Sequence, residues 1–218
     1  MFRTRSIQST LNFREKIMSI DYILVLSVLT LGIISMFTMY STDGGVFDYH
    51  TKNHIIRFFL FFSLFLIFSL FQIRFWFQSS TYIYIVIILL LLGVKYFGIS
   101  SSGSQRWINF YFMNLQPSEL MKIGLILFLA KYYHRAPTSE VNSFKYLFLP
   151  FLALFLPVLL VVTQPDLGTS ILIAAGGIIV VWLAGVKIKF FAYMLVLLSA
   201  LTPIAISFLK PYQKSRIL

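Results

Sequence analysis

Five residues in this largely apolar chain are of types that can hold a charged ligand: Arg106, Trp107, Glu119, Lys122 and Asp166. A guanidinium is a fork-shaped donor for anions, and a Trp ring suits a membrane interface or can stack on a sugar. Ionisable residues within membrane spans usually face a protein interior or an aqueous cavity and often mark a site. Each residue taken singly also fits a structural role. A binding site is therefore predicted only if the five residues converge.

Arg106 and Trp107 belong to a polar segment that begins at Gly98 and leads directly into an apolar helix, GISSSGSQRWINFYFMNLQPSE. Loops of about 18 residues without structure are uncommon unless they are functional. Trp and Arg are also ordinary anchors at the level of the lipid headgroups. This segment alone therefore leaves both an interfacial anchor and a binding loop open.

The helix that follows carries two charged residues on one face. Pro117 suits the first helical position, and Glu119 stabilises the positive end of the helix. Lys122 follows Glu119 at i+3 on the same face. Local capping with an ion pair explains these residues, and so does a polar cavity near the membrane boundary.

Asp166 lies in the short connection Gln164-Pro165-Asp166-Leu167-Gly168-Thr169 between two apolar runs. An aspartate at this place can cap the next helix through the amide of Gly168 or Thr169. Capping and a role in binding are both consistent with the sequence here.

Composition places the elements around these residues in a membrane. Of 218 residues, 59% are hydrophobic and 11% are charged, whereas roughly 25% are charged in soluble domains. The chain has no cysteine, which excludes disulfides, thiolate metal sites and cysteine nucleophiles. The net charge of +11 lies between apolar runs, which indicates membrane lipids rather than nucleic acid as the partner.

A helical span needs about 20 mostly apolar residues, and the runs are continuously apolar rather than alternating. The sequence therefore predicts an all-α polytopic membrane protein with about seven transmembrane helices. They run approximately from Asp21 to Tyr40, Ile55 to Ile73, Tyr82 to Phe97, Pro117 to Tyr133, Tyr146 to Val162, Leu167 to Val186 and Phe190 to Leu209.

Basic residues predict that the N-terminus lies inside. With that orientation the inside segments hold 10 Lys and Arg residues and the outside segments before the tail hold 4. We expect residues 1–20 to be a cytoplasmic segment, 21–209 a membrane domain with an outside loop over 98–116, and 210–218 to lie outside. The five candidate residues then share the outer face and can converge in one crevice.

Other groups give weaker signals. His50 and His54 would share a helix face, but no acidic partner lies at metal-ligand spacing, so no metal site is predicted. No glycine pattern for nucleotide binding occurs. No cofactor is identified, although a divalent cation is possible.

Three motifs together resemble a known family. They are Gly103-Ser104-Gln105-Arg106-Trp107-Ile108, Gln116-Pro117-Ser118-Glu119 with Lys122, and Gln164-Pro165-Asp166-Leu167-Gly168-Thr169. In this order and spacing they are similar to the SEDS family (shape, elongation, division and sporulation), and within it most similar to the rod-shape (RodA) branch. The resemblance extends from about Asp21 to the end.

The resemblance implies a glycosyltransferase of the bacterial inner membrane that polymerises the peptidoglycan precursor lipid II during elongation and maintains rod shape. It implies a class B penicillin-binding protein, a transpeptidase, as partner. Arg106 and Lys122 would balance the diphosphate charge, and Trp107 would contact a sugar or the loop. Glu119 and Asp166 would hold the polar network of the crevice.

The chain differs from the family in one respect. Family members have about ten spans, and their catalytic Asp lies in a large outside loop after the seventh. The tail from Lys210 to Leu218 looks like the beginning of that loop. We therefore expect a truncated N-terminal portion with no catalytic residue within the 218, unable to polymerise lipid II alone.

Two other functions remain open. Charged residues in a membrane cavity also suit a flippase or exporter of a lipid-linked precursor. A non-catalytic membrane scaffold that binds its partner is the third possibility.

Overall fold

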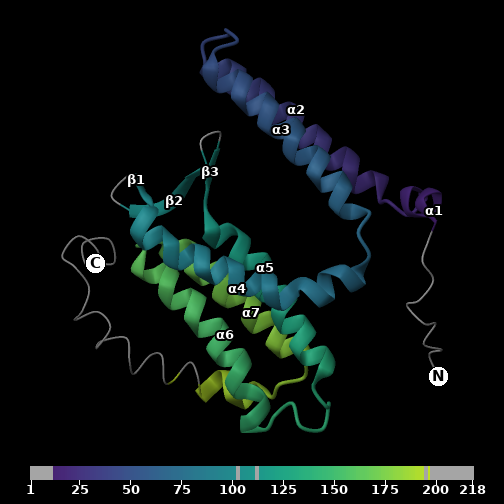
Figure 1. Ribbon diagram of the computed structural model, residues 1–218, viewed down its shortest axis with the longest axis vertical. Coiled ribbons are helices and arrows are strands. Elements are labelled where there is room, and N and C mark those ends of the chain that lie inside the picture. The colour runs from purple at the N-terminus through teal and green to yellow at the C-terminus, as the bar shows by residue number, and fades with distance from the viewer. Residues whose placement is uncertain (1–11, 102–103, 111–112, 194–195, 197–218) are drawn as a thin grey trace. The chain divides into compact units, whose positions relative to one another are not determined.

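The computed structural model describes residues 12–101, 104–110, 113–193 and 196 (Figure 1). It consists of two compact units, residues 1–73 and 74–218. The membrane domain expected over 21–209 is divided between them. The expected outside segment 210–218, most of the seventh span and Gly103 lie outside the described residues.

Unit 1 is a helical hairpin preceded by a short helix, α1 (Phe13–Met18). The hairpin consists of α2 (Tyr22–Thr42) and α3 (Tyr49–Ser69), which pack against each other. Asp21 caps α2 by accepting from the amides of Ile23 and Leu24 at 3.0 and 3.1 Å. His54 contacts the hydroxyl of Ser35 across the hairpin.

Asp43 closes this hairpin by capping α3 from the preceding turn. Its carboxylate accepts from the amide of Thr51 at 2.9 Å and from the Thr51 hydroxyl at 2.6 Å. The amide of Thr51 is one of the donors that a helix start leaves without an intrahelical partner. The Thr51 hydroxyl also lowers the pKa of Asp43 below its ordinary value of 3.8.

We expect Asp43→Asn to increase hydrogen exchange at the start of α3, because the charge-assisted cap is lost. Since the pKa of Asp43 is lowered in the folded state, its stabilising contribution is present above pH 3.8 and disappears as the pH falls below that value. Amide exchange of the segment that contains Thr51 measures both effects. Asp48→Asn is the control, because Asp48 immediately precedes α3 without a side-chain cap. Equal exchange in the two variants would contradict this role.

Among its described residues, unit 2 has the helices α4 (Ile73–Phe97), α5 (Pro117–Arg135), α6 (Phe144–Thr163) and α7 (Leu167–Leu183), further helical residues over 188–193, and a small sheet between α4 and α5. The helix α7 packs against both α5 and α6 (Figure 1). The buried core includes Leu91, Leu125 and Leu129 at 1% exposure or less. Gly124 and Gly177 lie where neighbouring helices leave no room for a side chain: a Cβ at Gly124 would lie 2.7 Å from Ile87, and one at Gly177 2.5 Å from Leu154.

A hydrogen bond from α4 satisfies a backbone carbonyl of α6 that has no donor within the helix. Pro157 lies inside α6 and has no N–H to donate to the carbonyl of Ala153, four residues earlier. The hydroxyl of Tyr84 donates to that carbonyl at 2.8 Å. Because both Tyr84 and Ala153 are buried, water does not replace this donor easily.

Tyr84→Phe should therefore destabilise the unit by about 1 to 3 kcal/mol, the usual cost of leaving a buried polar group unsatisfied. Unfolding by sodium dodecyl sulfate in mixed micelles, followed by circular dichroism, measures this change. Tyr82→Phe is the matched control, because Tyr82 is on the same helix and is 73% exposed. If both variants unfold like the parent chain, the hydrogen bond from Tyr84 to Ala153 contributes nothing to stability.

Among the residues that the structure describes, four helical segments are long and apolar enough to cross a membrane: Tyr22–Thr42, Tyr49–Ser69, Ile73–Val94 and Phe144–Thr163. The helix α7 is apolar but shorter. The predicted mostly helical, multi-pass fold is therefore confirmed. The predicted span from Pro117 to Tyr133 corresponds to α5, which carries Glu119, Lys122 and Lys131 among its apolar residues.

The segment expected as a loop over 98–116 forms a three-stranded antiparallel sheet in the order β1-β2-β3: β1 (Ile99–Ser101), β2 (Ser104–Phe110) and β3 (Met113–Leu115). Within β2, Trp107, Ile108 and Phe110 are types that favour strands. Successive strand residues point to opposite faces, so Arg106 and Trp107 point to opposite faces of β2. The sheet was not predicted, but it fixes the direction of the Arg106 side chain.

Candidate functional site

The starts of α5 and α7 are joined by polar side chains. Gln116 immediately precedes α5, and Asp166 immediately precedes α7. The Gln116 amide Nε2 donates to Asp166 Oδ2 at 3.0 Å and to the Ser118 hydroxyl at 3.1 Å. The two helices therefore begin at the same end of unit 2, with their positive ends together.

Arg106 completes this network from β2, which contacts α5. Its Nη1 lies 3.6 Å from Asp166 Oδ1, and the side chains of Arg106 and Asp166 are 28% and 9% exposed. A buried carboxylate requires a partner, and Arg106 supplies the compensating charge. We name the three residues Arg106, Gln116 and Asp166 the entry network.

Asp166 caps α7, as predicted, and also contacts two neighbouring side chains. Its Oδ1 accepts from the amide of Thr169 at 3.4 Å, which is the predicted cap of α7. The same carboxylate holds Arg106 and Gln116. Capping thus fixes the carboxylate in place while its remaining lone pairs organise the other two side chains.

Glu119 and Lys122 form a second ion pair, as their i+3 spacing predicted. Lys122 Nζ lies 2.8 Å from Glu119 Oε2, and the side chains are 30% and 53% exposed. In the described part of the chain Lys122 forms no ion pair with Asp166. The convergence of Glu119, Lys122 and Trp107 with Asp166 in one cavity stays a prediction.

Two glutamines were missed by the sequence reading. Besides Gln116, Gln164 is buried and donates from Nε2 to the carbonyl of Leu91 in α4 at 2.9 Å. Each glutamine immediately precedes a proline: Gln116-Pro117 at the start of α5, and Gln164-Pro165 in the connection between α6 and α7. This repeated Gln-Pro pair is the one signal in the sequence that points to them.

The arrangement combines a guanidinium, two adjacent helix N-termini and a carboxylate held in a fixed position. Helix N-termini and arginine favour anions, and phosphate groups above all. Within the described residues, no three His, Asp or Glu side chains lie together as a metal site. A guanidinium beside two helix N-termini is an arrangement that suits an anionic group.

Comparison with known sequences finds a matching family and named relatives. The family FtsW/RodA/SpoVE, described as cell cycle protein, matches residues 15–218. The peptidoglycan glycosyltransferase MrdB of Escherichia coli K12 is 40% identical over 142 residues, 64% of this chain and 37% of that protein. The probable peptidoglycan glycosyltransferase FtsW of Buchnera aphidicola from Acyrthosiphon pisum is 37% identical over 167 residues, 77% of this chain and 42% of that protein. The chain thus spans about two fifths of these relatives.

Two solved structures have a similar fold over most of this chain. The rod shape determining protein RodA of Thermus thermophilus superposes with a TM-score of 0.69 at 26% identity, over 84% of this chain and 60% of that one. A peptidoglycan synthase complex that coordinates polymerization and crosslinking gives a TM-score of 0.71 at 26% identity, over 91% of this chain and 58% of the other. By its sequence and its helical membrane fold, the chain belongs to the FtsW/RodA/SpoVE family, the SEDS family that its three motifs resemble.

Proposed function

We propose that this protein is a peptidoglycan glycosyltransferase of the bacterial inner membrane that acts on lipid II. The observation that carries the proposal is the entry network, in which Asp166 holds Arg106 beside the starts of α5 and α7. The names of the relatives from E. coli and Buchnera support the reaction class. With the N-terminus inside, as the basic residues predict, this end of unit 2 faces the outer leaflet.

The chemistry matches the leaving group of such a transfer. A glycosyl transfer from a polyprenyl diphosphate sugar breaks the bond between the sugar and the diphosphate, and negative charge grows on the diphosphate. Preorganised cations and helix dipoles stabilise that charge most in a site from which water is excluded. Arg106 is the residue assigned to the diphosphate, with Lys122 as a second cation and Trp107 as a contact for the loop or a sugar.

The finer proposal is a function of the RodA type, in elongation, with a class B penicillin-binding protein as partner. The 40% identity to MrdB and the similarity to the Thermus RodA structure support the first part. The solved synthase complex supports the second, because it couples polymerization with crosslinking.

A chimera tests this proposal in cells and in vitro. The aligned stretch of MrdB is replaced by the matching stretch of this chain, and the chimera is produced in E. coli depleted of MrdB. We expect rod shape to be restored, and the purified chimera to form glycan strands from lipid II. An Arg106→Gln chimera should lose both activities.

Two results would overturn the proposal. One is a chimera that is produced and inserted but leaves the cells round and forms no strands. The other is movement of lipid II between leaflets without strand formation, which would favour the exporter hypothesis instead.

A further inference from the structure

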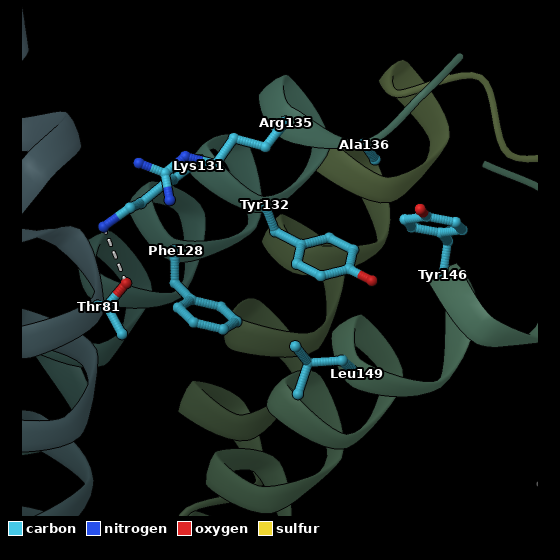
Figure 2. A pocket seen from close by; sticks show the side chains of 8 residues that line it. All are labelled: Thr81, Phe128, Lys131, Tyr132, Arg135, Ala136, Tyr146 and Leu149. Carbon is cyan, nitrogen blue, oxygen red and sulfur yellow. Dashed lines mark hydrogen bonds between the residues drawn. The ribbon is translucent and has the colours of Figure 1, made fainter. Parts of the chain in front are cut away.

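A second polar site lies at the opposite end of unit 2 from the entry network. A pocket of about 270 Å³ lies between α4, α5 and α6, and its lining includes Thr81, Phe128, Lys131, Tyr132, Arg135 and Tyr146. Figure 2 shows Lys131 and Arg135 close together, with the rings of Phe128, Tyr132 and Tyr146 around the hollow. We propose that this pocket binds the headgroup of an anionic phospholipid.

The two cations of the pocket share one small region. Lys131 Nζ lies 5.9 Å and Arg135 Cζ 5.4 Å from the centre of the same Phe77 ring. In the part of the chain that the structure describes, no carboxylate forms an ion pair with either side chain. Two neighbouring positive charges repel each other, and an anion between them removes that repulsion.

Lys131 is held in position for such a ligand. Its ammonium donates to the carbonyl of Gln78 and to the hydroxyl of Thr81, both at 3.0 Å, and both acceptors belong to α4. An ammonium has three N–H groups, so one remains for a phosphate oxygen. Arg135 adds a fork that suits two phosphate oxygens at once.

The position along α5 matches the membrane surface. From Pro117 to Arg135 the helix rises about 27 Å at 1.5 Å per residue, close to the roughly 30 Å of a bilayer's hydrocarbon core. If the start of α5 lies at one surface, Lys131 and Arg135 therefore reach the other. A basic pocket between membrane helices at such a surface is the kind of site that binds anionic lipid headgroups.

The remaining lining fits the rest of a phospholipid. Phe128 and Leu149 give the pocket an apolar side, and the adjoining outer face of α6 exposes Phe148 and Leu152. A soluble phosphate compound would use the cations alone, whereas a phospholipid would use both parts. A pocket with two cations and an apolar side therefore favours a lipid over a free anion.

Basic residues at the end of α5 also have a simpler effect, since they stabilise the negative end of a helix. That effect requires only that the charges lie in the last turn. It explains neither the two bonds from Lys131 to α4 nor the hollow beside the two cations. The two explanations differ in lipid selectivity, which the dipole effect does not produce.

The test uses the chain purified in detergent, with phosphatidylglycerol and phosphatidylcholine of identical acyl chains as probes. Native mass spectrometry measures the affinity for each lipid. We expect phosphatidylglycerol to bind about thirtyfold more tightly than phosphatidylcholine. The double variant Lys131→Gln, Arg135→Gln should weaken phosphatidylglycerol binding about thirtyfold, to the level of phosphatidylcholine.

Two further variants separate binding from folding and from net charge. Arg135→Gln alone leaves the bonds from Lys131 to α4 intact and should weaken binding about fivefold. The matched control is Lys187→Gln, Lys189→Gln. It removes two exposed charges at the same end of the unit, where the amide of Lys187 is held by Asn142 at 2.7 Å. This control should retain full selectivity.

Three results would overturn the proposal. They are equal affinity of the parent chain for both lipids, equal losses in the double variant and its control, and binding of free glycerol 3-phosphate as tight as that of phosphatidylglycerol. The last result would assign the pocket to a soluble anion.

Discussion

Asp166→Asn is expected to destabilise unit 2 by about 2 kcal/mol, because it removes the charge that compensates Arg106. Asparagine is a good capping residue, so the hydrogen bond to Thr169 can remain, while the change removes the ion pair together with the acceptor for Gln116. Removing one partner of a fully buried pair costs roughly 3 to 5 kcal/mol. The expected loss is smaller here because the Arg106 side chain is 28% exposed.

Glu119→Gln is the matched control for this prediction. It also removes a carboxylate from an ion pair at the start of a helix, but the Glu119 side chain is 53% exposed. Exposed pairs contribute only about 0 to 1 kcal/mol. Unfolding in mixed micelles should therefore separate the two variants clearly. If Asp166→Asn is no more destabilising than Glu119→Gln, the entry network is not a structural unit.

The second large effect is expected at the centre of the helix packing. Gly177→Leu should destabilise unit 2 by about 3 kcal/mol, since overpacking a core typically costs 1 to 3 kcal/mol and this position accepts no side chain. A Cβ there would lie 2.5 Å from Leu154 in α6 and 3.0 Å from Leu125 in α5. Because α7 also carries Asp166, forcing the helices apart should disturb the entry network as well.

The neighbouring glycine provides the control for this prediction. A Cβ at Gly176 would lie 3.6 Å from Ile126, an ordinary contact distance. Gly176→Leu should therefore unfold within about 1 kcal/mol of the parent chain in the same assay. Equal stability of the two leucine variants would show that α5, α6 and α7 do not meet at Gly177 as described.

The helices were predictable because their signals are local. Continuous apolar runs predicted α2 to α7, although α3 and α4 begin six and nine residues earlier than expected. Polar residues such as His50 and Lys52 hid the start of α3 from a criterion based on apolar length. Pro117 and Asp166 marked the starts of α5 and α7, because the shape of proline and the capping oxygen of aspartate act within one turn.

The contacts of the site were less predictable because they join residues distant in the chain. Topology placed Arg106 and Asp166 on the same side of the membrane but gave no reason for direct contact across 60 residues. Their contact depends on β2, which the sequence reading treated as a loop. Gln116 and Gln164 are neutral and carry no charge signal, so their bonds to Asp166 and Leu91 required the structure.

The charges of Lys131 and Arg135 were evident from the sequence, but the pocket beside them was not. The sequence reading counted them only as basic residues that set orientation. Their second property, a shared position over Phe77 beside a hollow, depends on the packing of α4 against α5. Charge counts alone do not distinguish such a pocket from a solvated end of a helix.

Binding of lipid II to the purified chain in lipid nanodiscs tests the central claim most directly. If the entry network receives the diphosphate, Arg106→Gln should weaken binding at least tenfold, since a hydrogen bond to a charged group contributes roughly 1.5 to 3 kcal/mol. Arg74→Gln, which removes an exposed arginine from α4, should bind like the parent chain. Equal affinity of the parent chain, Arg106→Gln and Arg74→Gln would contradict the account, because the diphosphate would then be recognised elsewhere.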